Sequence, residues 1–318
     1  MKKIIITGVS SFIGFHLAKF FSINFKVYGT LSMSLTNYSD INELRLKSIA
    51  GNITFIENFN LMHHNHIKEI ISKIKPDYFI HHAGWSKLYS SFDYDLVNGF
   101  NTNVIPLSVL FSSLKENNCK GIILTGSSAE YSDGEFPDLE TDICYPSTPY
   151  GFIKLSQSKY AKQLSNQYNL PTRIARVYIP FGPLDNPNKL LPYVINNLYN
   201  DRKSSLTSCS QIRDFIYIDE LVKIYEFLLL DLKNNNFEIY NSSSGKPLQL
   251  ISLLKLIVKE MSKPLNLLDF SSIKTRQLDQ KYSSANIIKL KEKYNVIDDI
   301  EIIDGIKDYL NFIKKNNY

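Results

Sequence analysis

The sequence predicts an α/β fold in which a doubly wound parallel sheet is joined to a smaller, interleaved α/β lobe. Short and almost continuously apolar strands alternate with helical segments over the first half of the chain, as in parallel sheets covered on both faces. A glycine-containing turn follows the first of these strands. Beyond Arg176 the alternation loosens, and a loop is marked by Pro180, Gly182, Pro183 and Pro187.

The elements of the first half follow one another in regular order. Apolar runs between turn residues predict strands, and apolar residues at helical spacing predict the helices that separate them. The predicted strands are Lys3–Thr7, Phe25–Thr30, Ile53–Ile56, Tyr78–His81, Gly121–Thr125 and Thr172–Val177. The predicted helices are Ser11–Phe21, Ile67–Ile74, Asp93–Glu116 and Pro149–Gln167.

Composition narrows the class of protein. The 318 residues, 44% of them hydrophobic, suffice for a folded core. A net charge of +5 without a dense basic run argues against nucleic acid binding. Three cysteines at irregular spacing form neither a disulfide framework nor a zinc site, which suits a reducing cytoplasm. The apolar run after Met1 is too short for a signal peptide, and no stretch reaches transmembrane length, so we expect a cytoplasmic protein without membrane contacts.

The segment Thr7–Gly14 connects the first strand to the first helix. At this place Gly8 permits a tight turn, and Gly14 allows the helix and the strand to approach closely. The backbone N–H groups and the helix dipole then suit the pyrophosphate of a dinucleotide, as in a Rossmann-type fold. Ser11 stands where a middle glycine is common, and its Cβ restricts the approach of the diphosphate.

The residues after the second strand indicate which dinucleotide binds. An acidic residue there would bind the adenosine ribose hydroxyls, but the next acid after Thr30 is Asp40. Without that acid a 2′-phosphate is not repelled. Thr30 and Ser32 can donate hydrogen bonds to it, and Arg45 can supply positive charge. The sequence therefore favours NADP(H) over NAD(H).

Tyr150 and Lys154 form the candidate catalytic pair, since side chains at i and i+4 share one face of a helix. A neighbouring ammonium lowers the pKa of a phenol towards the working range of a general acid or base. The hydroxyl of Ser128 follows the end of a strand and can bind a substrate carbonyl beside Tyr150. We expect one residue of the pair Ser127 and Ser128 to serve only as a turn residue or helix cap.

These features together resemble the extended short-chain dehydrogenases/reductases of the nucleotide-sugar epimerase/dehydratase family. The matching segments follow the order of the family from residue 3 to about residue 225. They are Thr7–Gly14, Ile80–Gly84, Asn103, Ser127–Tyr131, Tyr150 with Lys154, and Arg213–Asp219.

The resemblance implies a role for each matching residue. Tyr150 is the implied general acid/base, Lys154 its partner, and Ser128 the hydroxyl that polarises the reacting C–O bond. With Thr30 and Ser32, the expected cofactor-binding set is Gly8, Ser11, Phe12, Ile13, Gly14, Asn60, Leu61, Ala83, Gly84, Asn103, Tyr150 and Lys154. The expected substrate-binding set is Ser86, Ser128, Ala129, Glu130, Tyr150 and Arg213.

Arg213 is the residue implied to bind the substrate diphosphate, because a guanidinium fork matches that geometry. A surface ion pair with Asp214 or Asp219 is the structural alternative. We expect residues 1–178 and about 214–241 to form the dinucleotide-binding domain, and residues 179–213 and 242–318 the substrate-binding lobe.

A homodimer is also implied, formed through the long helices that contain Asn103 and Tyr150. Apolar positions on these helices would allow this pairing, although they would serve equally well in a core. They are Leu107, Leu110, Leu114, Tyr160 and Leu164.

The departures from the family pattern bear on the reaction. Sugar 4,6-dehydratases of the family usually carry an Asp-Glu pair just after the catalytic hydroxyl, and here Ala129 replaces the acid although Glu130 remains. Dehydration is therefore disfavoured. The missing ribose-binding acid favours reduction of a nucleotide-linked 4-keto-6-deoxyhexose by NADPH over 4-epimerisation with tightly bound NAD. We expect this reaction to serve polysaccharide biosynthesis.

Three further alternatives stay open from the sequence. A 4,6-dehydratase is the first, a non-catalytic NADP sensor is the second, and a reductase of a non-sugar ketone is the third. We predict no catalytic metal, because the cluster His63, His64 and His66 lacks an accompanying carboxylate or cysteine pattern.

Overall fold

The computed structural model describes residues 1–234, 236–275, 278–294 and 301–316. The chain divides into two compact units. The first unit contains Met1–Ser132, Glu140–Val177 and Val222–Ser242. The second contains Asp133–Leu139, Tyr178–Leu221 and Ser243–Tyr318. Residues 214–221, which we expected in the dinucleotide-binding domain, group with the second unit because their strand pairs with strands of that unit.

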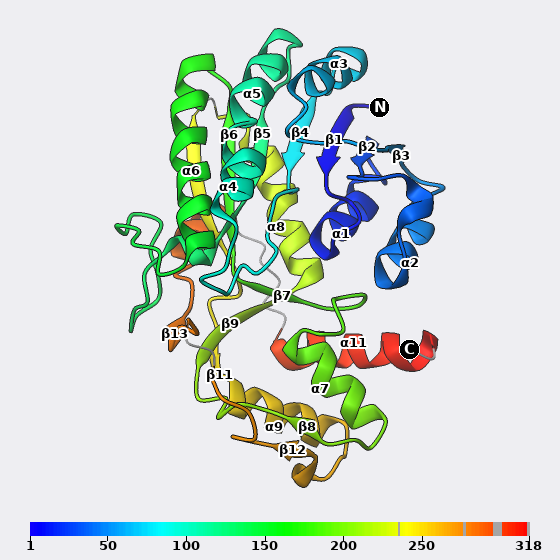
Figure 1. The fold of residues 1–318 in the computed structure, drawn as a ribbon, viewed down its shortest axis with the longest axis vertical. Helices are drawn as coiled ribbons and strands as arrows, with labels where there is room; N and C mark the ends of the chain where they lie inside the picture. The colour runs from blue at the N-terminus through cyan, green and yellow to red at the C-terminus, as the bar shows by residue number, and fades with distance from the viewer. Residues whose placement is uncertain (235, 276–277, 295–300, 317–318) are drawn as a thin grey trace. The chain divides into compact units, whose positions relative to one another are not determined.

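A seven-stranded sheet forms the centre of the first unit, and all of its strands are parallel (Figure 1). The order across the sheet is β10-β6-β5-β4-β1-β2-β3. The strands are β1 (Lys3–Thr7), β2 (Lys26–Thr30), β3 (Thr54–Ile56), β4 (Tyr78–His81), β5 (Ile122–Ser127), β6 (Thr172–Val177) and β10 (Phe237–Ser242). The predicted doubly wound parallel sheet is confirmed.

The strand order reverses between β1 and β4, since β2 and β3 extend the sheet on one side and β5, β6 and β10 on the other. The loops that leave β1 and β4 therefore run in opposite directions. In open parallel sheets a crevice forms at this point, outside the carboxyl ends of the strands. Ligand-binding residues of the first unit are accordingly expected just after Thr7 and His81.

Helices α3, α5 and α6 cover one face of this sheet and pack against one another. Helix α8 lies on the opposite face, where the hydroxyl of Tyr225 contacts that of Thr125 on β5. The helical segments of this part of the chain are α1 (Phe12–Phe21), η1 (Leu35–Asn37), α2 (Asp40–Ile49), α3 (His64–Ile74), α4 (Leu96–Gly99), η2 (Phe100–Val104), α5 (Leu107–Glu116), η3 (Ser128–Glu130), α6 (Pro149–Tyr168) and α8 (Ile218–Asp231).

The single helix expected over Asp93–Glu116 is interrupted. Helix α4 passes into η2, a five-residue π-helical turn, before α5 begins. Pro106 explains the change, because proline has no N–H to donate to the carbonyl four residues earlier. The N–H of Ile105 instead reaches the carbonyl of Phe100 at 3.0 Å, a bond over five residues. Such turns often occur at functional sites.

The apolar positions considered for dimer formation lie in the core. Leu107, Leu110 and Leu114 have no exposed surface, and Leu164 is 2% exposed. All four belong to the cluster that α3, α5 and α6 form over the sheet, and Tyr160 packs against it. These five side chains stabilise the fold of one subunit and do not present an apolar face.

The second unit is organised around β9. This strand is antiparallel to β11 and parallel to β13 and β7. The elements of this unit are β7 (Ile179–Phe181), α7 (Leu190–Tyr199), β8 (Ser204–Ser205), β9 (Ile212–Tyr217), β11 (Pro247–Gln249), α9 (Leu250–Glu260), η4 (Leu265–Leu267), β12 (Leu268–Asp269), β13 (Tyr282–Ser283), α10 (Ile288–Lys293) and α11 (Ile302–Asn316). None of the helices that the structure describes combines the length and apolarity needed for a membrane span.

A buried ion pair joins β6 to the end of α8. Nε of Arg173 donates to Oδ2 of Asp231 at 2.6 Å, and neither side chain is more than 5% exposed. Nη2 of Arg173 also donates to the Asp231 carbonyl at 2.6 Å, so the guanidinium caps the helix. Burial alone would raise the pKa of Asp231, but hydrogen bonds from Tyr240 and Arg173 lower it overall.

Replacing Arg173 by alanine is expected to destabilise the protein strongly, because the Asp231 carboxylate would be left buried without its partner. We expect a loss of about 3–5 kcal/mol in the free energy of unfolding, measured by urea denaturation. Lys120→Ala is the matched control, since it removes an exposed pair with Asp77 and should cost less than about 1 kcal/mol. Equal losses in the two variants would contradict this account.

Candidate active site

The turn between β1 and α1 is closed by side-chain and backbone hydrogen bonds. Gly8 has a φ of +75°, which a residue with a side chain rarely adopts. The hydroxyl of Ser11 donates to the Gly8 carbonyl at 2.7 Å and accepts from the Gly14 N–H at 3.2 Å. A Cβ at Gly14 would lie 2.3 Å from the Gly8 oxygen. Ser11 therefore caps α1, and its hydroxyl turns into the loop.

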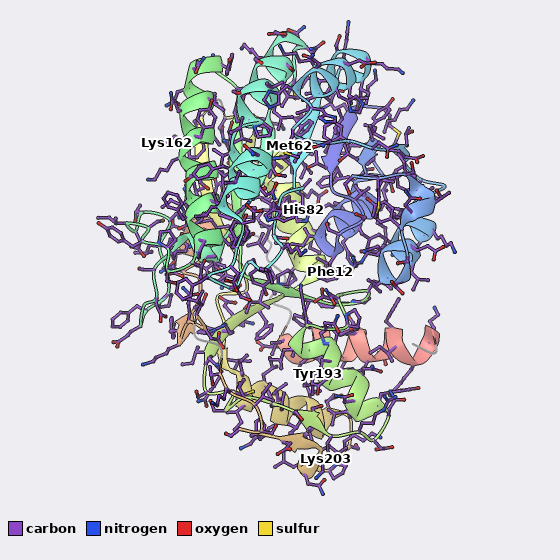
Figure 2. The ribbon with its side chains drawn as sticks, in the orientation of Figure 1. Phe12, Met62, His82, Lys162, Tyr193 and Lys203 are labelled. Carbon is purple, nitrogen blue, oxygen red and sulfur yellow. The ribbon has the colours of Figure 1, made fainter. Side chains whose placement is uncertain are left out.

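The start of α1 presents backbone N–H groups and the positive end of the helix dipole, a combination that suits a phosphate. Phe12 is buried and Ile13 half-buried at this end of the helix. Figure 2 labels Phe12 here, together with His82, which follows β4. The expected pyrophosphate-binding segment thus has the required local geometry.

Thr30 and Ser32, expected near the adenosine ribose, have different surroundings. The hydroxyl of Thr30 is buried and accepts the Gly8 N–H at 3.2 Å, so it holds the glycine-containing turn. Ser32 is exposed, and its hydroxyl lies 3.2 Å from that of Tyr38. Of the two, only Ser32 reaches the surface.

Arg45 lies beside the same turn. Its Nη1 donates to the Ser10 carbonyl at 3.0 Å and to Oδ1 of Asn42 at 2.9 Å. Its guanidinium carbon lies 5.9 Å from the centre of the Phe12 ring. A positive charge from α2 is therefore fixed next to the expected dinucleotide site, which sequence spacing alone did not establish.

Asn60 and Leu61, expected near the adenine, follow β3. Oδ1 of Asn60 accepts the N–H of Met62 at 2.9 Å. The side chain of Leu61 is 5% exposed and belongs to the core under α3. At Leu61 only the backbone is available to a ligand.

Thr7 links the carboxyl ends of β1 and β4. Its hydroxyl oxygen accepts the N–H groups of His82 and Ala83, both at 2.9 Å. The hydroxyl proton is then directed to Nδ1 of His81 at 3.2 Å. A Cβ at Gly8 would lie 3.1 Å from Cα of Ala83, so the two expected cofactor-binding loops are in contact. These contacts join the loops after β1 and β4 at the point where the strand order reverses.

Asn103 positions the loop after β4. From the π-helical turn, its Oδ1 accepts the Trp85 N–H at 2.6 Å and its Nδ2 donates to the Trp85 carbonyl at 3.1 Å. A Cβ at Gly84 would lie 2.8 Å from Oδ1 of Asn103, so a side chain at position 84 would displace this amide. Ser86, expected at the substrate, follows directly and is exposed.

Tyr150 lies at the start of α6, where Thr148 caps the helix through the Gly151 N–H at 3.0 Å. The rings of Tyr89 and Tyr94 pack edge-on against it, with centroids 5.8 and 5.7 Å away. Burial, and then the charges nearby, raise the pKa of Tyr150. The pKa of Tyr150 is therefore not lowered overall as we expected, because burial outweighs the hydrogen bond from Ser127.

Lys154 is buried one helical turn after Tyr150. Its Nζ donates to the Thr125 carbonyl at 2.6 Å and to Oε1 of Gln157. Burial lowers the pKa of Lys154 to about 8, and the charge of Glu130 acts in the opposite direction. Two of the three N–H groups of the ammonium are therefore already used.

Two histidines at the end of β4 stay neutral beside this ammonium. Burial, and then the charge of Lys154, lower the pKa of both His81 and His82 to about 3. Nδ1 of His82 lies 3.0 Å from the hydroxyl of Thr125. The imidazoles therefore act as hydrogen-bonding groups and not as charges.

The hydroxyl that contacts Tyr150 belongs to Ser127. A hydrogen bond from Ser127 opposes the rise in the pKa of the phenol. The reason is the strand itself, because Ser127 is the last extended residue of β5 and Ser128 begins the following turn. We therefore propose Ser127, which also caps that turn, in place of Ser128 as the hydroxyl beside Tyr150.

Glu130 lies beneath the turn and not on its surface. It is fully buried, with Oε1 accepting the Ser127 N–H and Oε2 accepting Nε of Arg176, both at 3.0 Å. The Ala129 carbonyl lies so close to α6 that a Cβ at Gly151 would approach it to 2.1 Å. Both residues, expected at the substrate, therefore have packing roles that position Ser127 against Tyr150.

Arg213 lies on β9 in the second unit. Its Nη2 donates to Oδ1 of Asp279 and to the Gln280 carbonyl, both at 2.5 Å. The partner is Asp279 and neither of the two acids considered from the sequence. Asp214 instead accepts hydrogen bonds from the Ser244 hydroxyl and the Gly245 N–H.

We predict that Ser127→Ala lowers turnover roughly 100-fold, the usual effect of removing a hydroxyl that stabilises charge on a reacting oxygen. Ser128→Ala is the matched control and should change turnover little. Steady-state kinetics of both variants, with thermal unfolding as a check on the fold, measure this. A larger loss in the Ser128 variant would restore our first assignment.

Comparison with known proteins agrees with this arrangement. The model of the NAD dependent epimerase/dehydratase family matches residues 4–242. A dTDP-D-glucose 4,6-dehydratase of Dictyostelium discoideum is 26% identical over 81% of the chain, but the match spans only 62% of that relative. A UDP-glucuronate 4-epimerase of Thermodesulfobacterium geofontis is 25% identical, with 98% of this chain and 96% of the relative covered.

Solved structures show the same fold. The UDP-glucose 4-epimerase of Thermotoga maritima, solved with UDP-glucose, superposes with a TM-score of 0.86 at 21% identity, covering 99% of this chain and 100% of that one. The UDP-glucuronic acid 4-epimerase of Bacillus cereus, in complex with UDP-glucuronic acid and NAD, gives 0.87 at 21% identity, with 99% of each chain covered. With the glycine-containing turn, the Tyr150–Lys154 pair and a family match over most of its length, the chain belongs to the NAD dependent epimerase/dehydratase family of nucleotide-sugar enzymes.

Proposed function

We propose that the protein reduces a nucleotide-linked 4-keto-6-deoxyhexose with NADPH. The observation that carries this proposal is the composition of the site around Tyr150. Ser127, Tyr150 and Lys154 are all present, whereas the two positions that follow Ser127 hold Ser128 and Ala129. With Ser127 as the catalytic hydroxyl, the Asp-Glu pair of the dehydratases falls at positions 128 and 129 instead of 129 and 130. Neither Ser128 nor Ala129 is acidic, so a dehydratase is disfavoured.

Glu130 does not replace the missing acid. Its two oxygens are occupied by Arg176 and by the Ser127 backbone, and its side chain has no exposed surface. A carboxylate held in a buried ion pair is not available to transfer protons to a substrate. The turn after β5 therefore supports redox chemistry at one carbon, without elimination at its neighbours.

The proposed reaction needs one hydride and one proton. A dinucleotide held by the turn after β1 would supply the hydride to the carbonyl carbon. Tyr150 gives its phenol proton to the carbonyl oxygen, which the hydroxyl of Ser127 polarises. The ammonium of Lys154 stabilises the phenolate that remains until a proton returns from solvent.

The surroundings of the turn after β1 support NADPH as the cofactor. No acid follows β2 before Asp40, and Arg45 is fixed beside the Ser10 carbonyl. A guanidinium there favours a 2′-phosphate, which a carboxylate would repel. NAD is the competing cofactor, since the epimerase from Bacillus cereus was solved with it.

A 4-epimerase is the second candidate function. The relative from Thermodesulfobacterium geofontis carries that name and aligns over nearly the full length of both chains. Epimerisation uses the same Ser127, Tyr150 and Lys154, but the cofactor is regenerated within each turnover. The two reactions therefore differ in whether NADPH is consumed.

The homodimer stays a prediction. The five core positions considered from the sequence do not form its interface, so we propose a different surface of the same helices. Exposed apolar side chains lie on α4, at Ile105 just after the π-helical turn and at the start of α6, and the ring centroids of Phe100 and Phe152 lie 6.1 Å apart. Val97 is 70% exposed, Phe152 50% and Ile105 45%. A cytoplasmic location and a role in polysaccharide biosynthesis stay predictions as well.

Incubation of the protein with NADPH and 4-keto-6-deoxy sugars linked to dTDP, CDP, GDP or UDP tests the proposal. We expect one NADPH oxidised for each keto sugar that gains two hydrogens, by absorbance and mass spectrometry, and a lower kcat/KM with NADH. Tyr150→Phe, which keeps the ring, is the control and should abolish turnover. Isomerisation of a hydroxy sugar at constant mass without loss of NADPH would establish the epimerase instead.

A further inference from the structure

Gln157 lies on the same face of α6 as the catalytic pair. Positions 150, 154 and 157 follow the i, i+4, i+7 spacing that places side chains along one stripe of a helix. Gln157 is 3% exposed, so its amide is removed from water. Its Oε1 accepts a hydrogen bond from Nζ of Lys154. Because an ammonium can only donate, the oxygen of the amide must face Lys154.

The ammonium of Lys154 is held by two neutral oxygens. The Thr125 carbonyl accepts one N–H at 2.6 Å, and Gln157 accepts the second. The third N–H is left for Tyr150 or for a hydroxyl of the bound cofactor. Neither oxygen carries a full charge, so the charged form of Lys154 depends on these two hydrogen bonds in a buried place.

The other titratable groups around Lys154 do not replace this contact. His81 and His82 face it from the end of β4 and are neutral. Glu130 acts on it from the turn after β5, but that carboxylate is bound to Arg176. Tyr150 lies on the same helix and is a neutral phenol. Gln157 is therefore the side chain that holds the ammonium most directly.

We propose that Gln157 is the positioning residue of the catalytic pair, holding the Lys154 ammonium in its charged form against the Thr125 carbonyl. The inference rests on the proposed function only in giving Tyr150 and Lys154 a role in catalysis. The proposal concerns a hydrogen bond to an ammonium group. Removal of such a bond commonly lowers the pKa of the ammonium by about one unit or more. For Lys154, already lowered to about 8, such a change reaches the neutral range.

Substitution of Gln157 by leucine and by glutamate tests the proposal, because the two variants should shift the pKa of Lys154 in opposite directions. Gln157→Leu removes the acceptor and should lower the pKa of Lys154 by about one unit. Gln157→Glu adds a negative charge and should raise it. Gln163→Leu, at an exposed position of the same helix, is the matched control and should leave the pKa unchanged.

The pKa is measured by NMR titration of cofactor-free protein labelled at the lysine ε-carbons. The signal of Lys154 is identified by its absence in Lys154→Arg. The alkaline limb of kcat/KM should move in the same direction as the pKa in each variant. At pH values where Lys154 is charged in all variants, kcat of the leucine variant should return to that of the wild type, which loss of packing alone would not produce.

An unchanged pKa in Gln157→Leu, or a loss of kcat that persists at low pH, would overturn the proposal. If the leucine variant does not fold, a pKa that fails to rise in Gln157→Glu overturns it equally. The titration needs no sugar substrate. Failure of the proposed reduction would therefore leave this result intact, and the two failures can be distinguished.

Discussion

Thr125, at the carboxyl end of β5, is the residue on which the candidate active site depends. Its carbonyl holds the Lys154 ammonium at 2.6 Å, while its hydroxyl contacts Tyr225 at 2.6 Å and His82 at 3.0 Å. One residue thus joins α6, α8 and the end of β4. Because the position of Thr125 is fixed by the pairing of β5 with its neighbours, the sheet itself sets the location of the buried charge.

A second set of contacts holds the turn that carries the Ser127 hydroxyl against the start of α6, where the Tyr150 phenol lies. The Ala129 carbonyl packs on Gly151, and Glu130 binds Arg176 beneath the same turn. The ion pair is fully buried, so the carboxylate is taken away from chemistry and used for structure. The interaction that holds the turn carrying Ser127 therefore also keeps the Glu130 carboxylate buried.

The expected dinucleotide site is also held together by side chains at the ends of strands. Thr7 and Thr30 end neighbouring strands, and their hydroxyls accept backbone N–H groups of the loops after β4 and β1. Both hydroxyls thus hold the loops at the carboxyl ends of the strands, and Arg45, which is 3% exposed, holds the turn after β1 through the Ser10 carbonyl. Serine at position 11 fits this scheme, because its hydroxyl caps α1 and closes the turn that a glycine would otherwise leave looser.

Local sequence patterns determined most of the first unit. Apolar runs predicted the bounds of β1, β4 and β6, because parallel strands are buried on both faces. The glycines at positions 8 and 14 predicted the turn before α1. The tertiary structure decided what spacing cannot encode. Pro106 interrupts the expected long helix, which becomes α4, the π-helical turn and α5. The end of β5 at Ser127 favours that residue over Ser128 as the proposed catalytic hydroxyl. Glu130, Gln157 and Arg45 acquired their partners only through packing, since Arg176, Lys154 and Ser10 are brought to them by the fold.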